Sequence, residues 1–146
     1  MVAKNKTLPQ STGFCPVRAY TYDEDKEING IWFDLPEGSR VKVARFGNPK
    51  FIEVYQRIVN ELAPDIQKLT EEQQKELDIE ATRKTFAEVG LLDWENLVNL
   101  DGSELVYSKE AAAELLEIRD FYSLISAFSQ MSSLFLKYKI EDTVKN

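Results

Sequence analysis

The sequence predicts a mainly α-helical α+β domain, in which a small N-terminal β-hairpin is followed by a bundle of about four helices. Three observations support this fold class. First, 146 residues of which 43% are hydrophobic are enough for one domain with its own core. Second, two strand-like segments stand near the N-terminus. Third, most of the remaining chain has apolar residues at helical spacing, divided by proline, glycine and capping signals.

The domain boundaries follow from proline positions and from composition. Residues 1–27 are predicted to form an extended polar arm, because Leu8–Pro9 and Cys15–Pro16 disfavour helix before each proline. Residues 28–140 are predicted to be a single, mostly helical globular domain. Residues 141–146 are predicted to be a frayed tail.

The hairpin is predicted from two strand-like segments, residues 28–35 and 39–46. Pro36, Glu37 and Gly38 between them are typical of a turn. In the second segment Val41 and Val43 alternate with basic residues, which indicates a half-buried strand. The basic outer face consists of Arg40, Lys42 and Arg45. An exposed edge of this hairpin could also pair with another sheet.

Two helices are predicted after the hairpin. Asn48 and Pro49 open the first as N-cap and first helical residue, and Pro64 ends or kinks it. Thr70 opens the second, with a capping box completed by Gln73, and Gly90 ends it. The second helix has few apolar positions, so we expect it to be a solvated outer helix.

The C-terminal third is predicted to be a short linker followed by helix. Residues 94–107 form the linker, in which Asp101–Gly102 makes a tight turn between two short extended pieces. Ser108 caps a helix that begins at Lys109. The helical pattern continues to about Tyr138, with a possible break near Arg119–Asp120.

Residues 121–136 are 16 consecutive residues without a charge. Apolar side chains cover about half of the helical cylinder, and serines fill much of the other half. Two interpretations stay open: a central helix buried in its own domain, or a helix whose second face binds a partner or another copy. The candidate protein-interaction residues are Phe121, Leu124, Ile125, Ser126, Phe128, Met131, Ser133 and Phe135.

Catalytic, cofactor and metal sites are not expected. The chain has no histidine, the commonest general base and metal ligand. Asp23–Glu27 fails the calcium-loop pattern, since Ile28 stands where that pattern needs glycine. Cys15 has no histidine to activate it. Trp32 and Trp94 are interpreted as core anchors, and paired carboxylates such as Glu71–Glu72 as ordinary helix-start residues. We therefore expect a protein that is not an enzyme.

The charge distribution bears on partners. A net charge of −7 repels phosphate backbones and anionic membranes, so neither nucleic acid nor a membrane is an expected partner. Residues 37–60 hold 5 basic and 2 acidic side chains, and residues 61–104 hold 4 basic and 12 acidic ones. These two stretches could pair within one fold or between copies. The single cysteine favours a reducing cytoplasm.

The order of features from Trp94 onward resembles the tail assembly chaperones of siphophages, the long-tailed bacteriophages. In that family a tryptophan-led segment ends in an Asp–Gly turn and an aromatic–Ser helix cap, and helices complete the domain. The matching features here are Trp94, Val98, Asp101–Gly102, Val106-Tyr107-Ser108, Leu115-Leu116, Phe121, Phe128 and Phe135. Residues 32–51 are similar to members that begin with a strand pair. The resemblance covers about residues 30–138.

The resemblance implies a non-catalytic chaperone in the host cell cytoplasm that is absent from the mature virion. Such a protein coats the tape measure protein before tail assembly, self-associates as a homo-oligomer and recruits tail tube subunits. The alternative from a different class is a structural or adaptor subunit, such as a connector or neck component, that is retained in the virion.

Overall fold

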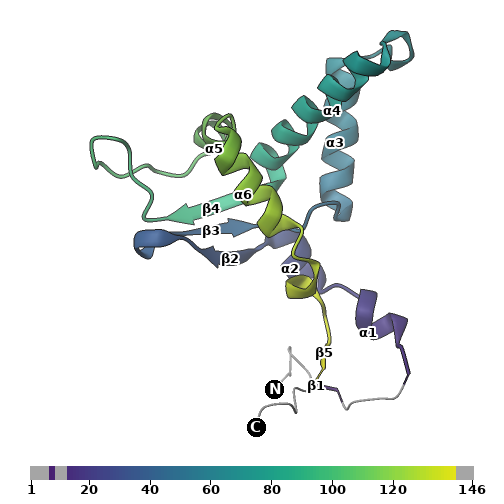
Figure 1. Ribbon diagram of the computed structural model, residues 1–146, viewed down its shortest axis with the longest axis vertical. Helices are drawn as coiled ribbons and strands as arrows, with labels where there is room; N and C mark the ends of the chain where they lie inside the picture. The colour runs from purple at the N-terminus through teal and green to yellow at the C-terminus, as the bar shows by residue number, and fades with distance from the viewer. Residues whose placement is uncertain (1–6, 9–12, 141–146) are drawn as a thin grey trace.

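The computed structural model describes residues 7–8 and 13–140 of the chain. Figure 1 shows a small sheet in the middle of the fold. Along the described part of the chain, two α-helices precede this sheet, two lie between its second and third strands, and two follow it. The six α-helices of the described residues are α1 Pro16–Tyr20, α2 Glu24–Asn29, α3 Pro49–Leu62, α4 Glu71–Thr85, α5 Lys109–Leu115 and α6 Arg119–Ser129. The strands are β1 Thr7–Leu8, β2 Ile31–Asp34, β3 Arg40–Val43, β4 Leu91–Glu95 and β5 Lys139–Ile140.

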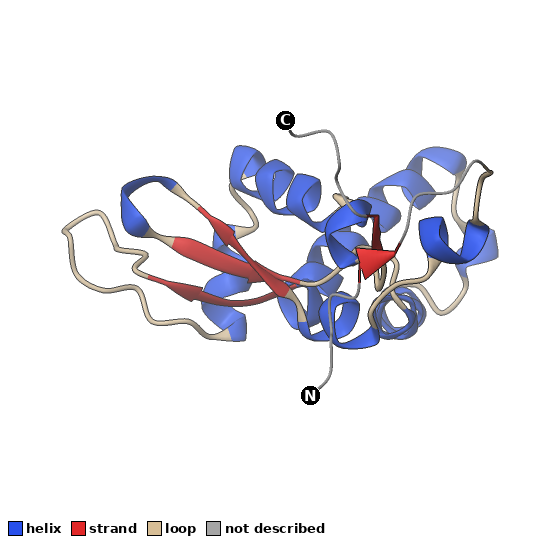
Figure 2. Ribbon diagram, turned by 90° about the horizontal axis from the view of Figure 1, so that it is seen from below, coloured by secondary structure: helices blue, strands red, loops and turns tan. Residues whose placement is uncertain are grey.

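The central sheet has three antiparallel strands in the order β2-β3-β4 (Figure 2). Phe33 pairs with Val41 between β2 and β3, and Val41 pairs with Trp94 between β3 and β4. The predicted fold class, a hairpin followed by a helix bundle, is therefore wrong: the protein is a mixed α+β domain with the sheet in its middle. The prediction failed because β4 follows a helix directly and finds its partner about 50 residues earlier in the chain.

Helices α3 and α4 form a hairpin that projects from the sheet (Figure 1). The side chain of Asn48 accepts hydrogen bonds from the backbone of Lys50 and Phe51, which confirms the predicted cap of α3. The capping box of Thr70 and Gln73 is also confirmed. After Thr85 the chain continues as a π-helical turn, Phe86–Gly90, and the helix ends at Gly90 as predicted. The two helices pack through Val54, Ile58 and Ala81.

The helical pattern from Lys109 was predicted to continue to about Tyr138, with a possible break near Arg119–Asp120. The break is present, but the extent to Tyr138 is wrong. Residues 116–118 break the helix between α5 and α6, and α6 ends at Ser129. Ser129 is fully buried; its hydroxyl donates to the Ala44 carbonyl at 2.7 Å, and its own carbonyl accepts from Phe46 N–H at 3.0 Å. These tertiary hydrogen bonds engage the hydroxyl and the carbonyl of Ser129 at the helix end, and a short 3₁₀ turn, Ser132–Phe135, follows.

The described part of the predicted extended arm contains two short helices. Pro16 stands at the start of α1, with Cys15 as its N-cap, and Asp23 caps α2. Proline disfavours helix in the residue before it but is well suited to the first helical position, so the same residue that predicted extended chain opens a helix. Residues 1–6, 9–12 and the predicted tail 141–146 lie outside the described residues.

The main core lies between the inner face of the sheet, the π-helical turn and α6. Its fully buried members include Val41, Phe86, Leu91, Ile125 and Phe135. Trp94 is 5% exposed, and its indole N–H donates to the Leu105 carbonyl at 2.7 Å, so it is the core anchor that was predicted. Trp32 instead is half-buried, and the Arg40 guanidinium lies 4.1 Å above its ring.

No helix of residues 7–8 and 13–140 combines the length and the apolar character needed to cross a membrane.

Candidate protein-interaction surface

The eight candidate residues of 121–136 do not share one face, because the helix ends at Ser129. Three of them belong to the core. Ile125 and Phe135 are fully buried, and the ring of Phe128 stacks on Phe33 with 4.4 Å between centroids. For these three residues the structure favours the buried-helix interpretation over the binding interpretation.

The other candidates reach the surface to different extents. Leu124 and Met131 are 37% and 43% exposed, and Ser133 is exposed as well. Ser126 is half-buried, and its hydroxyl accepts from the Gln130 amide at 2.9 Å. Leu134, which was not a candidate, is 47% exposed. The outer side of α6 and the turn after it therefore present a small apolar patch rather than a full helix face.

Phe121 differs from the others because it lines a groove of about 450 Å³ that we call the apolar groove. The groove lies where the β2–β3 turn, the chain after β4 and the α5–α6 region meet. It is lined mainly by aliphatic and aromatic side chains, with Glu37, Ser39 and Asn96 as its polar members. The apolar lining residues are Leu35, Pro36, Leu97, Val98, Leu105, Leu115 and Phe121.

A protruding loop, residues 96–107, forms one wall of the apolar groove and extends away from the sheet (Figure 1). The Leu105 N–H donates to the Leu97 carbonyl at 2.9 Å, and Val98 and Glu104 form an antiparallel bridge. These contacts confirm the predicted Asp101–Gly102 turn between two extended pieces. The loop exposes aliphatic side chains to solvent: Val98 is 56% exposed, Val106 68% and Leu100 fully.

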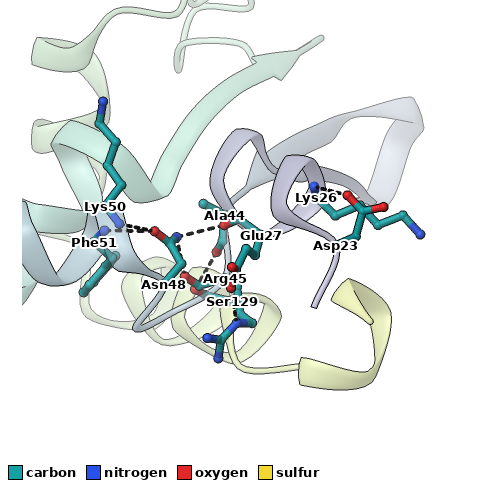
Figure 3. A network of polar contacts seen from close by, with 9 residues as sticks. All are labelled: Asp23, Lys26, Glu27, Ala44, Arg45, Asn48, Lys50, Phe51 and Ser129. Carbon is teal, nitrogen blue, oxygen red and sulfur yellow. Dashed lines mark hydrogen bonds and ion pairs between the residues drawn. The ribbon is translucent and has the colours of Figure 1, made fainter. Parts of the chain in front are cut away.

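A polar network supports the fold around the start of α3 (Figure 3). The side-chain amide of Asn48 donates to the carbonyls of Glu27 and Arg45, each at 2.8 Å. The Arg45 guanidinium forms an ion pair of 3.0 Å with Glu27 and lies over the ring of Tyr22. The groups satisfy one another, so this network is structural and offers no open binding position. Arg45 therefore does not belong to the basic outer face predicted for the hairpin.

The basic and acidic stretches of the sequence pair within the fold at two places. Arg40 binds Glu95 on the neighbouring strand through two hydrogen bonds of 2.8 and 3.1 Å. Arg57 on α3 forms ion pairs with Glu61 and with Glu88. Exposed pairs of this kind stabilise a fold weakly. Their main consequence here is that these two arginines are already occupied.

Tyr55 gives a pH-dependent test of the α3–α4 contact. Burial, followed by its hydrogen bond to Asp78, raises the pKa of Tyr55 from 10.0 to about 12. A raised pKa means that the protonated phenol stabilises the fold, fully below pH 10 and progressively less as the pH rises toward 12. The absorbance difference at about 295 nm between wild type and Tyr55→Phe is expected to titrate near pH 12. A midpoint near pH 10 would contradict both the burial of Tyr55 and its hydrogen bond to Asp78.

The described residues contain no group of three or more cysteine, aspartate, glutamate or histidine side chains placed to hold a metal ion.

Sequence patterns identified one member of the apolar groove, Phe121, and missed the rest. The groove is built from four separate segments that only the fold brings together, so no local pattern marks it. A usable signal was present in the protruding loop, where the aliphatic residues Val98, Leu100 and Val106 stand close to the Asp101–Gly102 turn. Exposed apolar side chains that gather in one place are a feature of interaction surfaces.

A comparison with known protein families finds a match for the C-terminal two thirds of this chain. A family model described as YdaY prophage protein matches residues 46–146, which is more than half of the sequence. The matched part contains the protruding loop, α5 and α6. No curated protein matches the chain, and no solved structure matches it either.

Proposed function

We propose that this phage-derived chain, which belongs to the YdaY prophage protein family, is a non-catalytic tail assembly chaperone. In this role it binds the tape measure protein in the host cytoplasm, self-associates and helps to recruit tail tube subunits. The resemblance of residues 30–138 to siphophage tail assembly chaperones supplies the partners. The prophage origin of the family agrees with a role in phage assembly.

The observation that carries the proposal is the apolar groove beside the protruding loop. A tape measure protein is long and helical, and an amphipathic helix binds by placing its apolar side chains in a groove of this kind. The groove offers Leu97, Leu115 and Phe121 as partly buried walls, and Val98 as an exposed rim. Leu100, which is fully exposed, extends the apolar surface along the loop.

The acidic exterior fits the same role. A tape measure segment without its tail tube exposes apolar helix faces that aggregate. A bound chaperone with net charge −7 covers those faces and keeps the complex soluble through charge repulsion.

Val98→Asp is expected to weaken binding of the tape measure protein about tenfold or more, because it places an unpaired carboxylate at the rim of an apolar site. Val98 is 56% exposed, so the fold should tolerate the change. Calorimetric titration with tape measure segments of the same phage measures the effect. Co-expression adds a second measurement, the soluble fraction of the tape measure protein.

Val106→Asp is the matched control for that variant. Val106 lies on the same protruding loop and is 68% exposed, but it does not line the apolar groove. It should bind nearly as wild type does. Equal losses in both variants would show that the loop, and not the groove, binds; no loss in either would remove the groove from the proposal.

Mass spectrometry of purified virions separates the chaperone from an adaptor subunit. A chaperone is present in infected cells and absent from mature tails. Abundant peptides of this chain in finished particles would favour the connector or neck component instead.

A further inference from the structure

A second hollow, of about 610 Å³, lies on the fold and is chemically unlike the apolar groove. Three lysines line it: Lys42 from β3, Lys50 from the start of α3 and Lys109 from the start of α5. Its apolar wall consists of Ile28, Val89 and Leu92. We call it the lysine hollow. Three cations from separate elements converge there in a chain whose net charge is −7.

The positive charge of the lysine hollow is only partly balanced. Glu88 lines it, but this carboxylate is occupied by Arg57. Asp93 lies opposite Lys42 in the strand pair, and one of its oxygens accepts from the Trp94 N–H. None of the three lysines forms an ion pair with another described residue. The hollow thus keeps an excess of positive charge beside an apolar wall.

Helix α4 carries a surface of the opposite kind. Glu72, Glu76 and Glu80 follow one another at four-residue spacing, so they lie along one side of the helix. All three are exposed, and Ile79, which is 52% exposed, lies among them. We call these four residues the acidic ridge. A helix that exposes carboxylates beside an isoleucine is complementary to a hollow with lysines beside aliphatic side chains.

The acidic ridge and the lysine hollow of one chain do not meet. Glu88 lines the hollow at the end of the α4 segment, eight residues beyond Glu80, which is about 12 Å along a helix. Glu72 lies about 24 Å from the same level. Lys50 is at the start of α3, where the α3–α4 hairpin joins the sheet, while the ridge extends toward the free end of that hairpin (Figure 1).

We infer that the lysine hollow binds the acidic ridge of a second copy of this chain. The inference rests on the proposed function in one respect, since it assigns a surface to the self-association proposed there. Charge complementarity determines the orientation of the two copies, and Ile79 against the apolar wall supplies the area that leaves water. The apolar groove shares no lining residue with the lysine hollow and remains free for the tape measure protein.

Charge exchange between the two surfaces tests the inference. The hollow variant carries Lys42→Glu, Lys50→Glu and Lys109→Glu; the ridge variant carries Glu72→Lys, Glu76→Lys and Glu80→Lys. Each variant alone places like charges in contact and is expected to raise the dissociation constant of self-association at least tenfold in sedimentation velocity. An equimolar mixture restores opposite charges and is expected to associate as wild type does.

A matched control changes the charge by the same amount elsewhere. Lys68→Glu, Arg119→Glu and Lys137→Glu replace three exposed cations that do not line the hollow. This variant should associate like wild type. The inference is overturned if wild type remains monomeric, if the hollow variant associates normally, or if the mixture stays monomeric while both variants keep the wild-type circular dichroism spectrum.

Titration with tape measure segments keeps this inference separate from the proposed function. Hollow and ridge variants should bind the segments through the intact groove, and Val98→Asp should self-associate. If the hollow and ridge variants lose self-association but wild type does not bind the tape measure segments, the contact between ridge and hollow is supported and the chaperone role is contradicted.

Discussion

Replacing Phe86 by alanine is expected to lower the free energy of unfolding by about 3–5 kcal/mol, because it removes a fully buried ring. Phe86 is fully buried at the start of the π-helical turn. Its ring packs edge-on against Phe51 at 5.1 Å and Tyr122 at 5.6 Å between centroids. It therefore joins α3, the end of α4 and α6, and its removal leaves a cavity that none of these elements can close alone.

The same ring also restricts the residue at position 90. A Cβ atom on Gly90 would lie 2.4 Å from the Phe86 ring, so the ring occupies the space that any larger residue at position 90 would need. Urea denaturation followed by circular dichroism measures the loss. Phe46→Ala is the control: Phe46 stacks on Phe86 at 6.1 Å but is 39% exposed, so about 1 kcal/mol is expected. Equal losses in both variants would contradict the central position of Phe86.

Replacing Asn48 by alanine is expected to cost about 3 kcal/mol. The side chain is 1% exposed and makes four hydrogen bonds: it caps α3 through two backbone N–H groups and donates to the carbonyls of Glu27 and Arg45. An N-cap contributes about 1 kcal/mol and each of the other bonds about 1 kcal/mol. Both carbonyls keep a backbone donor, from Arg45 and from Asn48 itself, so neither is left without a partner.

Thr70→Ala separates capping from this wider network. Thr70 caps α4 in the same way but is exposed and holds no distant carbonyl. Its loss should be about 1 kcal/mol. Urea denaturation of both variants gives the comparison, and an Asn48→Ala loss no larger than that of Thr70→Ala would mean that the contacts to Glu27 and Arg45 add nothing.

Local signals in the sequence were reliable where a single helix end was concerned. Asn48, Thr70 and Ser108 cap the helices that were predicted to begin after them, and Gly90 ends the helix that was predicted to end there. The three caps act through hydrogen bonds to backbone within three residues, so they do not depend on the rest of the fold.

Predictions failed where a distant segment decided the outcome. Residues 91–95 became the third strand because β3 offers them an unpaired edge, whereas the sequence analysis predicted no strand there and began a linker at Trp94. The uncharged stretch 121–136 was correctly selected as unusual, but its helix stops at Ser129 because Ala44 and Phe46 bind that residue. Its candidate residues consequently divide among the core, the surface patch and the apolar groove.

The sequence by itself determined the helix starts, the Asp101–Gly102 turn and the unequal distribution of acidic and basic residues, because each depends on neighbours in the chain. Only the tertiary structure decided the three-stranded sheet, the end of α6 and the two hollows. The apolar groove and the lysine hollow each collect side chains from elements far apart in sequence, and their shape exists only after the sheet has formed. The fold class first predicted, a hairpin followed by a helix bundle, was wrong for the same reason.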